Sequence, residues 1–137
     1  MINVLNNHSD KYLEMAFDSK RLERVENPDG YGKRKGDCGD TIEMFLSISS
    51  NKIKHINFSI DGCINTVACA NTIARLAEGK TINEAWGVSP ESVIEYLETL
   101  PEHEKHCAEL AASVFYQALV NYKKNSQESW KKPYLRN

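Results

Sequence analysis

Residues 41–63 read TIEMFLSISSNKIKHINFSIDGC, and apolar side chains alternate with polar ones along both halves of this stretch. Alternation with a period of two is typical of a strand that buries one face. Ser49-Ser50-Asn51 separates the halves with turn-forming residues. The stretch therefore predicts an antiparallel β-hairpin. Its buried positions are Ile42, Met44, Leu46 and Ile48 on the first strand and Ile56, Phe58 and Ile60 on the second, whereas Glu43, Phe45 and Ser47 are expected on the opposite face.

Helix signals follow the hairpin. We expect one helix over about residues 66–78, closed by a glycine, and a short one that begins at the capping box Thr81-x-x-Glu84. Ser89-Pro90-Glu91 predicts another start, because proline is tolerated at the first helical position. After Pro101 a last helix is expected with a single apolar stripe, formed by Cys107, Leu110, Ala111, Val114, Ala118 and Leu119.

The segment before the hairpin predicts one helix and a loop. Ser9–Val25 has helical spacing, with Leu13, Phe17 and Leu22 as its apolar positions. Residues 26–39 contain Pro28 and several glycines and are interpreted as a loop, with no strand indicated. The order predicts an α+β fold in which helices pack on one face of a small antiparallel sheet.

Length and composition restrict the function classes. The 137 residues suffice for one domain with a hydrophobic core, expected over about residues 12–124, followed by a polar tail at 125–137. A formal net charge of −2 provides no basic surface for nucleic acid or membrane. The first residues, MINVLNNHSDKY, show no signal peptide, and no apolar run is long enough to span a membrane. We therefore expect a cytoplasmic protein with reduced thiols.

Three of the four cysteines lie at junctions between predicted elements. Cys38 lies in the loop sequence Gly-Asp-Cys-Gly-Asp, where no apolar neighbour favours burial. Cys63 separates a strand from a helix, and Cys107, beside His106, opens the last helix. A helix start favours a thiolate at such positions. Thiolates bind zinc or iron–sulfur clusters, but the chain has no C-x₂-C pair, so the ligands would have to converge from distant segments.

These motifs together resemble the IscU/NifU-type iron–sulfur cluster assembly scaffold family, over about residues 12–124. The matching segments are Asp37-Cys38-Gly39-Asp40 before a strand, Asp61-Gly62-Cys63 before a helix, Glu78-Gly79-Lys80, His106-Cys107 at a helix start, and an early Glu26-Asn27-Pro28. The resemblance implies an IscU-like fold with a cluster site at one end. It also implies a carrier rather than an enzyme.

In that family three cysteines receive sulfur from a cysteine desulfurase, hold a labile cluster that is typically [2Fe–2S], and pass it to apo-proteins. Carried over by position, the resemblance implies that Cys38, Cys63 and Cys107 bind the cluster. It further implies that Asp40 assists assembly and release and that His106 is a neighbouring ligand. It leaves open whether a homodimer shares the cluster and whether zinc occupies the isolated protein.

The residues also allow plainer interpretations. Asp40 could cap the end of its loop, and His106 could be a surface histidine. Cys69 lies on a helical apolar stripe and is either a buried packing residue or an additional ligand or sulfur relay. A thiol enzyme using Cys107 with His106 as base is disfavoured, because neighbouring helix residues project about 100° apart.

One segment departs from the family pattern. Where the family carries Leu-Pro-Pro-Val-Lys for chaperone recognition, this chain has residues 100–104 with the sequence Leu-Pro-Glu-His-Glu. Glu104 stands in the place of the lysine, and Lys105 falls one position later, which argues against use of a dedicated co-chaperone. His103 is expected to be exposed.

A sub-branch of the family supplies the alternative function, a zinc-binding sulfur acceptor that activates its desulfurase. Its members carry an insertion between the second and third cysteines and lack the histidine before the last one. Here the 63–107 segment is compact and His106 is present, which favours the scaffold.

Overall fold

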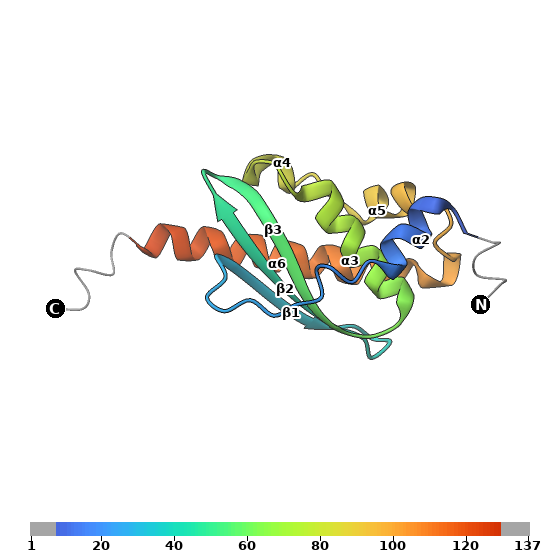
Figure 1. Ribbon diagram of the computed structural model, residues 1–137. Coiled ribbons are helices and arrows are strands. Elements are labelled where there is room, and N and C mark those ends of the chain that lie inside the picture. Colours follow the sequence, from blue (N-terminus) through green and yellow to red (C-terminus); the bar gives the residue numbers. More distant parts are fainter. Residues whose placement is uncertain (1–7, 130–137) are drawn as a thin grey trace.

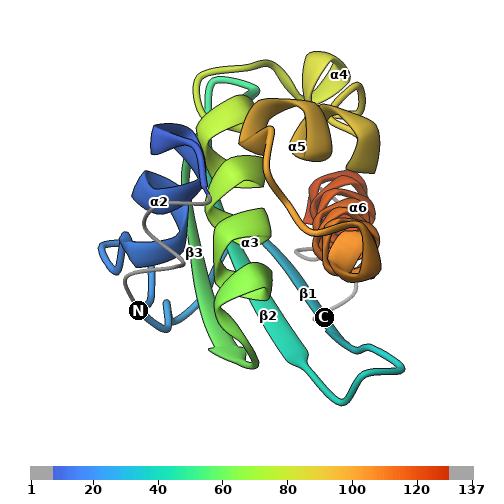
Figure 2. The ribbon, with the colours of Figure 1, turned by 90° about the vertical axis from the view of Figure 1, so that its right-hand side faces the viewer.

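A three-stranded antiparallel sheet in the order β1–β2–β3 lies against the helices in the computed structural model, which describes residues 8–129 (Figure 1). The two longest helices, α3 and α6, lie along the same face of the sheet (Figure 2). This confirms the predicted α+β fold. The elements are α2 (Asp10–Phe17), β1 (Gly30–Lys35), β2 (Thr41–Ser49), β3 (Lys52–Asp61), α3 (Ile64–Ala77), α4 (Ile82–Ala85), α5 (Pro90–Leu97), the 3₁₀ turn η1 (Glu102–Glu104) and α6 (Lys105–Ser129).

The predicted hairpin is present as β2 and β3. Met44 pairs with Phe58 and Leu46 with Ile56, and all four side chains are fully buried. The opposite face of β2 differs from the expectation at one position, because Phe45 is also buried. The ring of Tyr31 lies 5.5 Å from the ring of Phe45, and the Arg24 guanidinium lies over the Phe45 ring. The segment before the hairpin therefore covers this face of the sheet around Phe45.

The interpretation of residues 26–39 as loop was wrong for its middle part, because Gly30–Lys35 forms strand β1 beside β2. The glycines that suggested a loop serve a packing purpose. A Cβ on Gly30 would stand 2.6 Å from the carbonyl oxygen of Ala118, and one on Gly32 would stand 2.5 Å from that of Val114. Glycine therefore allows the backbone of α6 to lie directly on this strand.

The first helix is shorter than expected. Helix α2 ends at Phe17 instead of continuing to Val25, and Ser9 caps its start by accepting a hydrogen bond from the Tyr12 amide. Phe17 and Leu22, which helical spacing placed in the core, are 55% and 42% exposed. After the helix the chain turns at Lys20–Arg21, and Leu22 forms a parallel bridge with Phe58 on the free edge of β3.

The helices after the hairpin follow the sequence closely. Helix α3 begins two residues earlier than expected, which makes Cys63 its N-cap. The capping box of Thr81 and Glu84 is formed at α4, and Pro90 is the first residue of α5. The six residues predicted as the apolar stripe of α6 are all buried. Within residues 8–129 no helix is both long and apolar enough to cross a membrane.

Residues 12–124 were predicted as the core of a single domain, and this organisation stays a prediction. Apart from Phe45, the buried hydrophobic side chains of the described residues do form one cluster, from Tyr12 to Leu119. Helix α6 extends to Ser129, into the segment predicted as a polar tail, and residues 130–137 lie outside the described residues.

The close contact between β1 and α6 predicts a strong penalty for Gly32→Ala. The added methyl group would push against backbone atoms of Val114 and Ala118, which cannot move aside as a side chain could. We expect the free energy of unfolding to fall by about 2 kcal/mol, measured by urea denaturation. The control is Gly36→Ala, whose Cβ would have side-chain atoms of Leu110 and Cys38 as its nearest neighbours. Equal losses in the two variants would contradict this account.

Candidate metal centre

Three junctions of the chain meet at the open end of the β2–β3 hairpin. Asp40 directly precedes β2, Cys63 caps α3 after β3, and Cys107 is the third residue of α6. One ligand atom from each of the three residues lies within 4.8 Å of the others. A carboxylate and two thiols in this arrangement form a candidate site for a soft or borderline metal.

The Asp40 carboxylate joins the start of β2 to the start of α3. Its Oδ2 accepts a hydrogen bond from the Thr66 hydroxyl at 2.5 Å and another from the Cys63 backbone N–H at 3.2 Å. These bonds hold the pKa of Asp40 below its ordinary value, the Thr66 hydroxyl contributing most. Gly62 makes room for this approach, since a Cβ there would stand 2.7 Å from Asp40 Cγ.

Cys107 is buried beneath the other ligand candidates. Its Sγ lies 3.5 Å from Thr66 Oγ1 and donates to Glu104 Oε2 at 3.4 Å. Burial raises the pKa of the Cys107 thiol to about 12. In the metal-free protein, burial therefore opposes the ionisation that the helix start was expected to favour. A bound cation would reverse this balance.

A second group of donors shares Cys107. Glu104, His106 and Cys107 also bring one ligand atom each within 4.8 Å of one another. The Glu104 carboxylate lies 3.7 Å from His106 Nε2 and 3.6 Å from His103 Nε2. The His103 side chain is 81% exposed, as expected, whereas Glu104 is largely covered. The centre thus contains two donor triads joined at one thiol.

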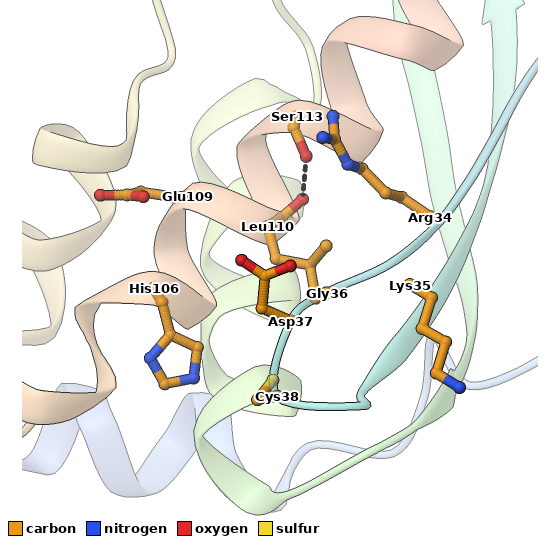
Figure 3. Close-up of a pocket in the computed structure, with 9 residues that line it drawn as sticks. All are labelled: Arg34, Lys35, Gly36, Asp37, Cys38, His106, Glu109, Leu110 and Ser113. Atoms are coloured by element: carbon orange, nitrogen blue, oxygen red, sulfur yellow. Dashed lines mark hydrogen bonds between the residues drawn. The ribbon is translucent and has the colours of Figure 1, made fainter.

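Cys38 lies apart from both triads. It is exposed on the turn between β1 and β2, where Gly39 adopts a φ of +94° and donates its N–H to the Gly36 carbonyl. With His106 it lines a cavity of about 560 Å³ between this turn and α6. In Figure 3, Cys38 and His106 lie at the same end of this cavity, with Arg34 and Ser113 at the other. His106 therefore links the cavity to the triads.

Cys69 lies in the core beside the centre. It is fully buried on α3, which agrees with the packing interpretation of this residue, and it belongs to neither triad. Burial raises the pKa of its thiol well above the ordinary value, and the nearby Cys107 and Cys63 add to the shift. Tyr12 covers the same region from α2, and its hydroxyl donates to Asn65 Oδ1 at 2.6 Å.

Comparison with known proteins assigns the family. Residues 10–129 match the NifU-like N-terminal domain. The chain is 32% identical over 116 residues to the iron–sulfur cluster assembly scaffold protein IscU 1 of Archaeoglobus fulgidus, covering 84% of this chain and 76% of that protein.

This chain belongs to the NifU-like N-terminal domain family. The family predicted from the cysteine motifs is therefore confirmed. The scaffold protein IscU of Escherichia coli K12 is 25% identical over 123 residues, covering 80% of this chain and 95% of that protein. The fold agrees with the crystal structure of a NifU-like N-terminal protein from Brucella abortus, with a TM-score of 0.69 at 15% identity, covering 85% of this chain and 94% of that one.

Two members of the NifU-like centre escaped the sequence analysis as site residues. Thr66 is fully buried and connects Asp40, Cys63 and Cys107. Its spacing from Cys63 matches a helix N-cap followed by the third helical residue, which could have marked it. Glu104 was noted only as a departure from the family pattern. Its spacing of three before Cys107 could have indicated a shared face, since residues three apart are neighbours on a helical turn.

Thr66→Val should weaken the junction in the metal-free protein. The variant keeps the side-chain shape but loses the hydroxyl that donates to a charged carboxylate. We expect the free energy of unfolding at pH 7 to fall by about 1–2 kcal/mol, measured by urea denaturation.

The pH dependence of this loss follows from the low pKa of folded Asp40. A depressed pKa stabilises the fold above the ordinary aspartate value of 3.8, and this stabilisation is lost as the pH falls through the folded value. The difference between wild type and Thr66→Val should therefore narrow in acid. Thr66→Ser retains the hydroxyl and should keep the wild-type pH dependence. A low Asp40 pKa in Thr66→Val, measured by NMR titration, would contradict this assignment.

Proposed function

We propose that this protein is a scaffold on which an iron–sulfur cluster, typically [2Fe–2S], is assembled and from which it is transferred to apo-proteins. The observation that carries the proposal is the convergence of Asp40, Cys63 and Cys107 within 4.8 Å, from three junctions distant in the sequence. Membership in the NifU-like family supports it, as do the Archaeoglobus and Escherichia relatives, which are named as cluster assembly scaffold proteins.

The mixed donor set suits a cluster that must be released. Four thiolates would hold iron firmly, whereas a carboxylate or imidazole at one position gives a more exchangeable site. Asp40 is held in place by Thr66 and by the Cys63 amide through a single oxygen, Oδ2. Because both of these bonds end on Oδ2, they can persist while Oδ1 faces a metal.

The exposed thiols define where partners act. Cys38 and Cys63 are exposed, and Cys38 also borders the cavity next to His106. On this proposal Cys38, Cys63 and Cys107 are the cluster thiolates, with Asp40 and His106 as the exchangeable donors. A cysteine desulfurase would deliver sulfur to the exposed thiols, and apo iron–sulfur proteins would receive the cluster from the same side.

The arrangement of Cys107 fits a carrier better than a thiol enzyme. Its Sγ is hydrogen-bonded to Glu104 and Thr66 rather than to His106, and it is buried. A nucleophilic cysteine needs access to its substrate and a lowered thiol pKa. We therefore assign Cys107 to binding.

Reconstitution tests the proposed function. Anaerobic incubation of the full chain with ferric iron and sulfide should give a brown protein with visible sulfur-to-iron charge-transfer bands. The cluster should pass to an apo-ferredoxin, and Asp40→Ala should slow this transfer several-fold. Absorption and circular dichroism spectroscopy measure both steps.

The alternative, a zinc-binding sulfur acceptor, makes the opposite prediction. A colourless protein that binds one zinc ion tightly and accepts no iron and sulfide would overturn the scaffold proposal. Stimulation of a cysteine desulfurase by the zinc-loaded protein would then support the alternative.

We also propose that Cys69 serves packing rather than ligation. A thiolate at this fully buried position would lose nearly all its solvation, and the residue contributes to neither donor triad. Cys69→Ala should therefore leave the iron and sulfide content after reconstitution unchanged, whereas Cys63→Ala should reduce it strongly. Loss of the cluster in a folded Cys69→Ala protein would show that Cys69 is a ligand or a sulfur relay.

A further inference from the structure

Glu104 occupies a position that the predicted ligand set does not explain. It is the last residue of η1, the 3₁₀ turn that leads directly into α6, and its N–H donates to the Pro101 carbonyl. The turn places Glu104 three residues before Cys107 and on the same side. Its side chain is 23% exposed, whereas that of Glu102 on the same turn is 85% exposed. The fold therefore directs one glutamate inward and the other outward.

The inward carboxylate lacks a permanent cationic partner among residues 8–129. Lys105, the nearest lysine in sequence, bonds to Glu102 at 2.6 Å instead. The ion pairs of Glu104 in the described part of the chain run to His103 and His106, which carry charge only when protonated. A carboxylate that is mostly covered gains from a nearby positive charge. A divalent cation at this point would supply that charge in every protonation state of the histidines.

The surrounding donors match such a cation. Glu104 Oε2 lies 3.4 Å from Cys107 Sγ and 3.7 Å from His106 Nε2, and ligand atoms of all three residues lie within 4.8 Å of one another. Carboxylate, imidazole and thiolate together suit borderline divalent ions such as Fe²⁺, Co²⁺ and Zn²⁺. The Asp40–Cys63–Cys107 triad offers an oxygen and two sulfurs, so the two triads differ in softness.

We propose that Glu104 is a metal ligand, and that Glu104, His106 and Cys107 form an entry site for a divalent iron ion next to the Asp40–Cys63–Cys107 triad. The inference rests on the proposed scaffold function only in taking iron as the cargo. As the ion binds, the Cys107 sulfur forms the metal bond and its proton passes to solvent, with no change of oxidation state. The exposed Cys38 is not needed at this stage, because it belongs to neither triad.

Cobalt binding to the metal-free full chain tests the proposal, since Co²⁺ reports its ligands through visible d–d and sulfur-to-metal bands. The variant is Glu104→Gln, which keeps the size of the side chain and an oxygen that can accept the Cys107 S–H bond but removes the anionic ligand. In a Cys63→Ser background, which disables the other triad, we expect Glu104→Gln to weaken Co²⁺ affinity at least about 10-fold, by the scale of such losses at metal sites. The matched control is Glu102→Gln, on the same turn and outside the centre, which should bind Co²⁺ like its Cys63→Ser parent.

The outcomes separate this inference from the scaffold function. Equal Co²⁺ affinity and spectra with and without Glu104→Gln would overturn the entry site and leave Glu104 as a hydrogen-bond acceptor for Cys107. Far-UV circular dichroism checks that each variant is folded, and Glu104→Asp, which keeps the charge on a shorter side chain, should recover part of the affinity. Cluster formation by the wild-type protein with iron and sulfide is measured in parallel by absorption spectroscopy. A brown wild type with unaffected Co²⁺ binding in Glu104→Gln rejects only the entry site, whereas a wild type that takes up no cluster rejects the scaffold function.

Discussion

The Asp40 carboxylate fastens the open end of the hairpin, and the candidate centre depends on this contact. β2 and β3 can align their strands without it, but their ends at Thr41 and Asp61 lead in different directions, one back to the turn that carries Cys38 and the other into α3. By accepting from both Thr66 and the Cys63 amide, Asp40 fixes the first turn of α3 against the start of β2. The thiol of Cys63 is thereby brought to the ligand atoms of its triad.

The Cys107 thiol is positioned by a different contact, the packing of α6 against β1. Gly30 and Gly32 have no side chains, so the backbone of α6 packs directly against the backbone of β1. This close packing fixes the distance between helix and strand. A helix held along most of its length keeps its first turn in place as well, and Cys107 is in that first turn. Cys107 is therefore positioned by packing away from the centre, whereas Cys63 is positioned by the Asp40 hydrogen bonds within it.

Much of this could be predicted from the sequence, and the failures have physical causes. Period-two alternation over residues 41–60 and local capping signals are encoded by neighbouring residues, and the hairpin, α4 and α5 were predicted correctly. Strand β1 was missed because its glycines are required for close packing against α6, some 85 residues later in the chain. A pattern of neighbouring residues cannot reveal such a distant contact. The cysteines at junctions between elements indicated the centre, but the ionisation of its thiols and the role of its acidic residues could not be predicted. Whether Cys107 is ionised depends on burial, and the inward direction of Glu104 depends on the 3₁₀ turn before α6.

Exposure divides the thiols of the centre into two kinds, and this division bears on how a cluster could form. Cys38 and Cys63 are exposed, so a large protein donor can reach them, whereas Cys107 is buried. On the proposed function, sulfur carried by another protein must therefore first meet Cys38 or Cys63. Iron, at the proposed entry site, would instead first meet His106, whose side chain is 45% exposed, and then Glu104 and Cys107. Sulfur and iron thus reach the centre by separate routes. Cys107 belongs to both donor triads, so it joins the proposed iron-binding residues to the residues that receive sulfur.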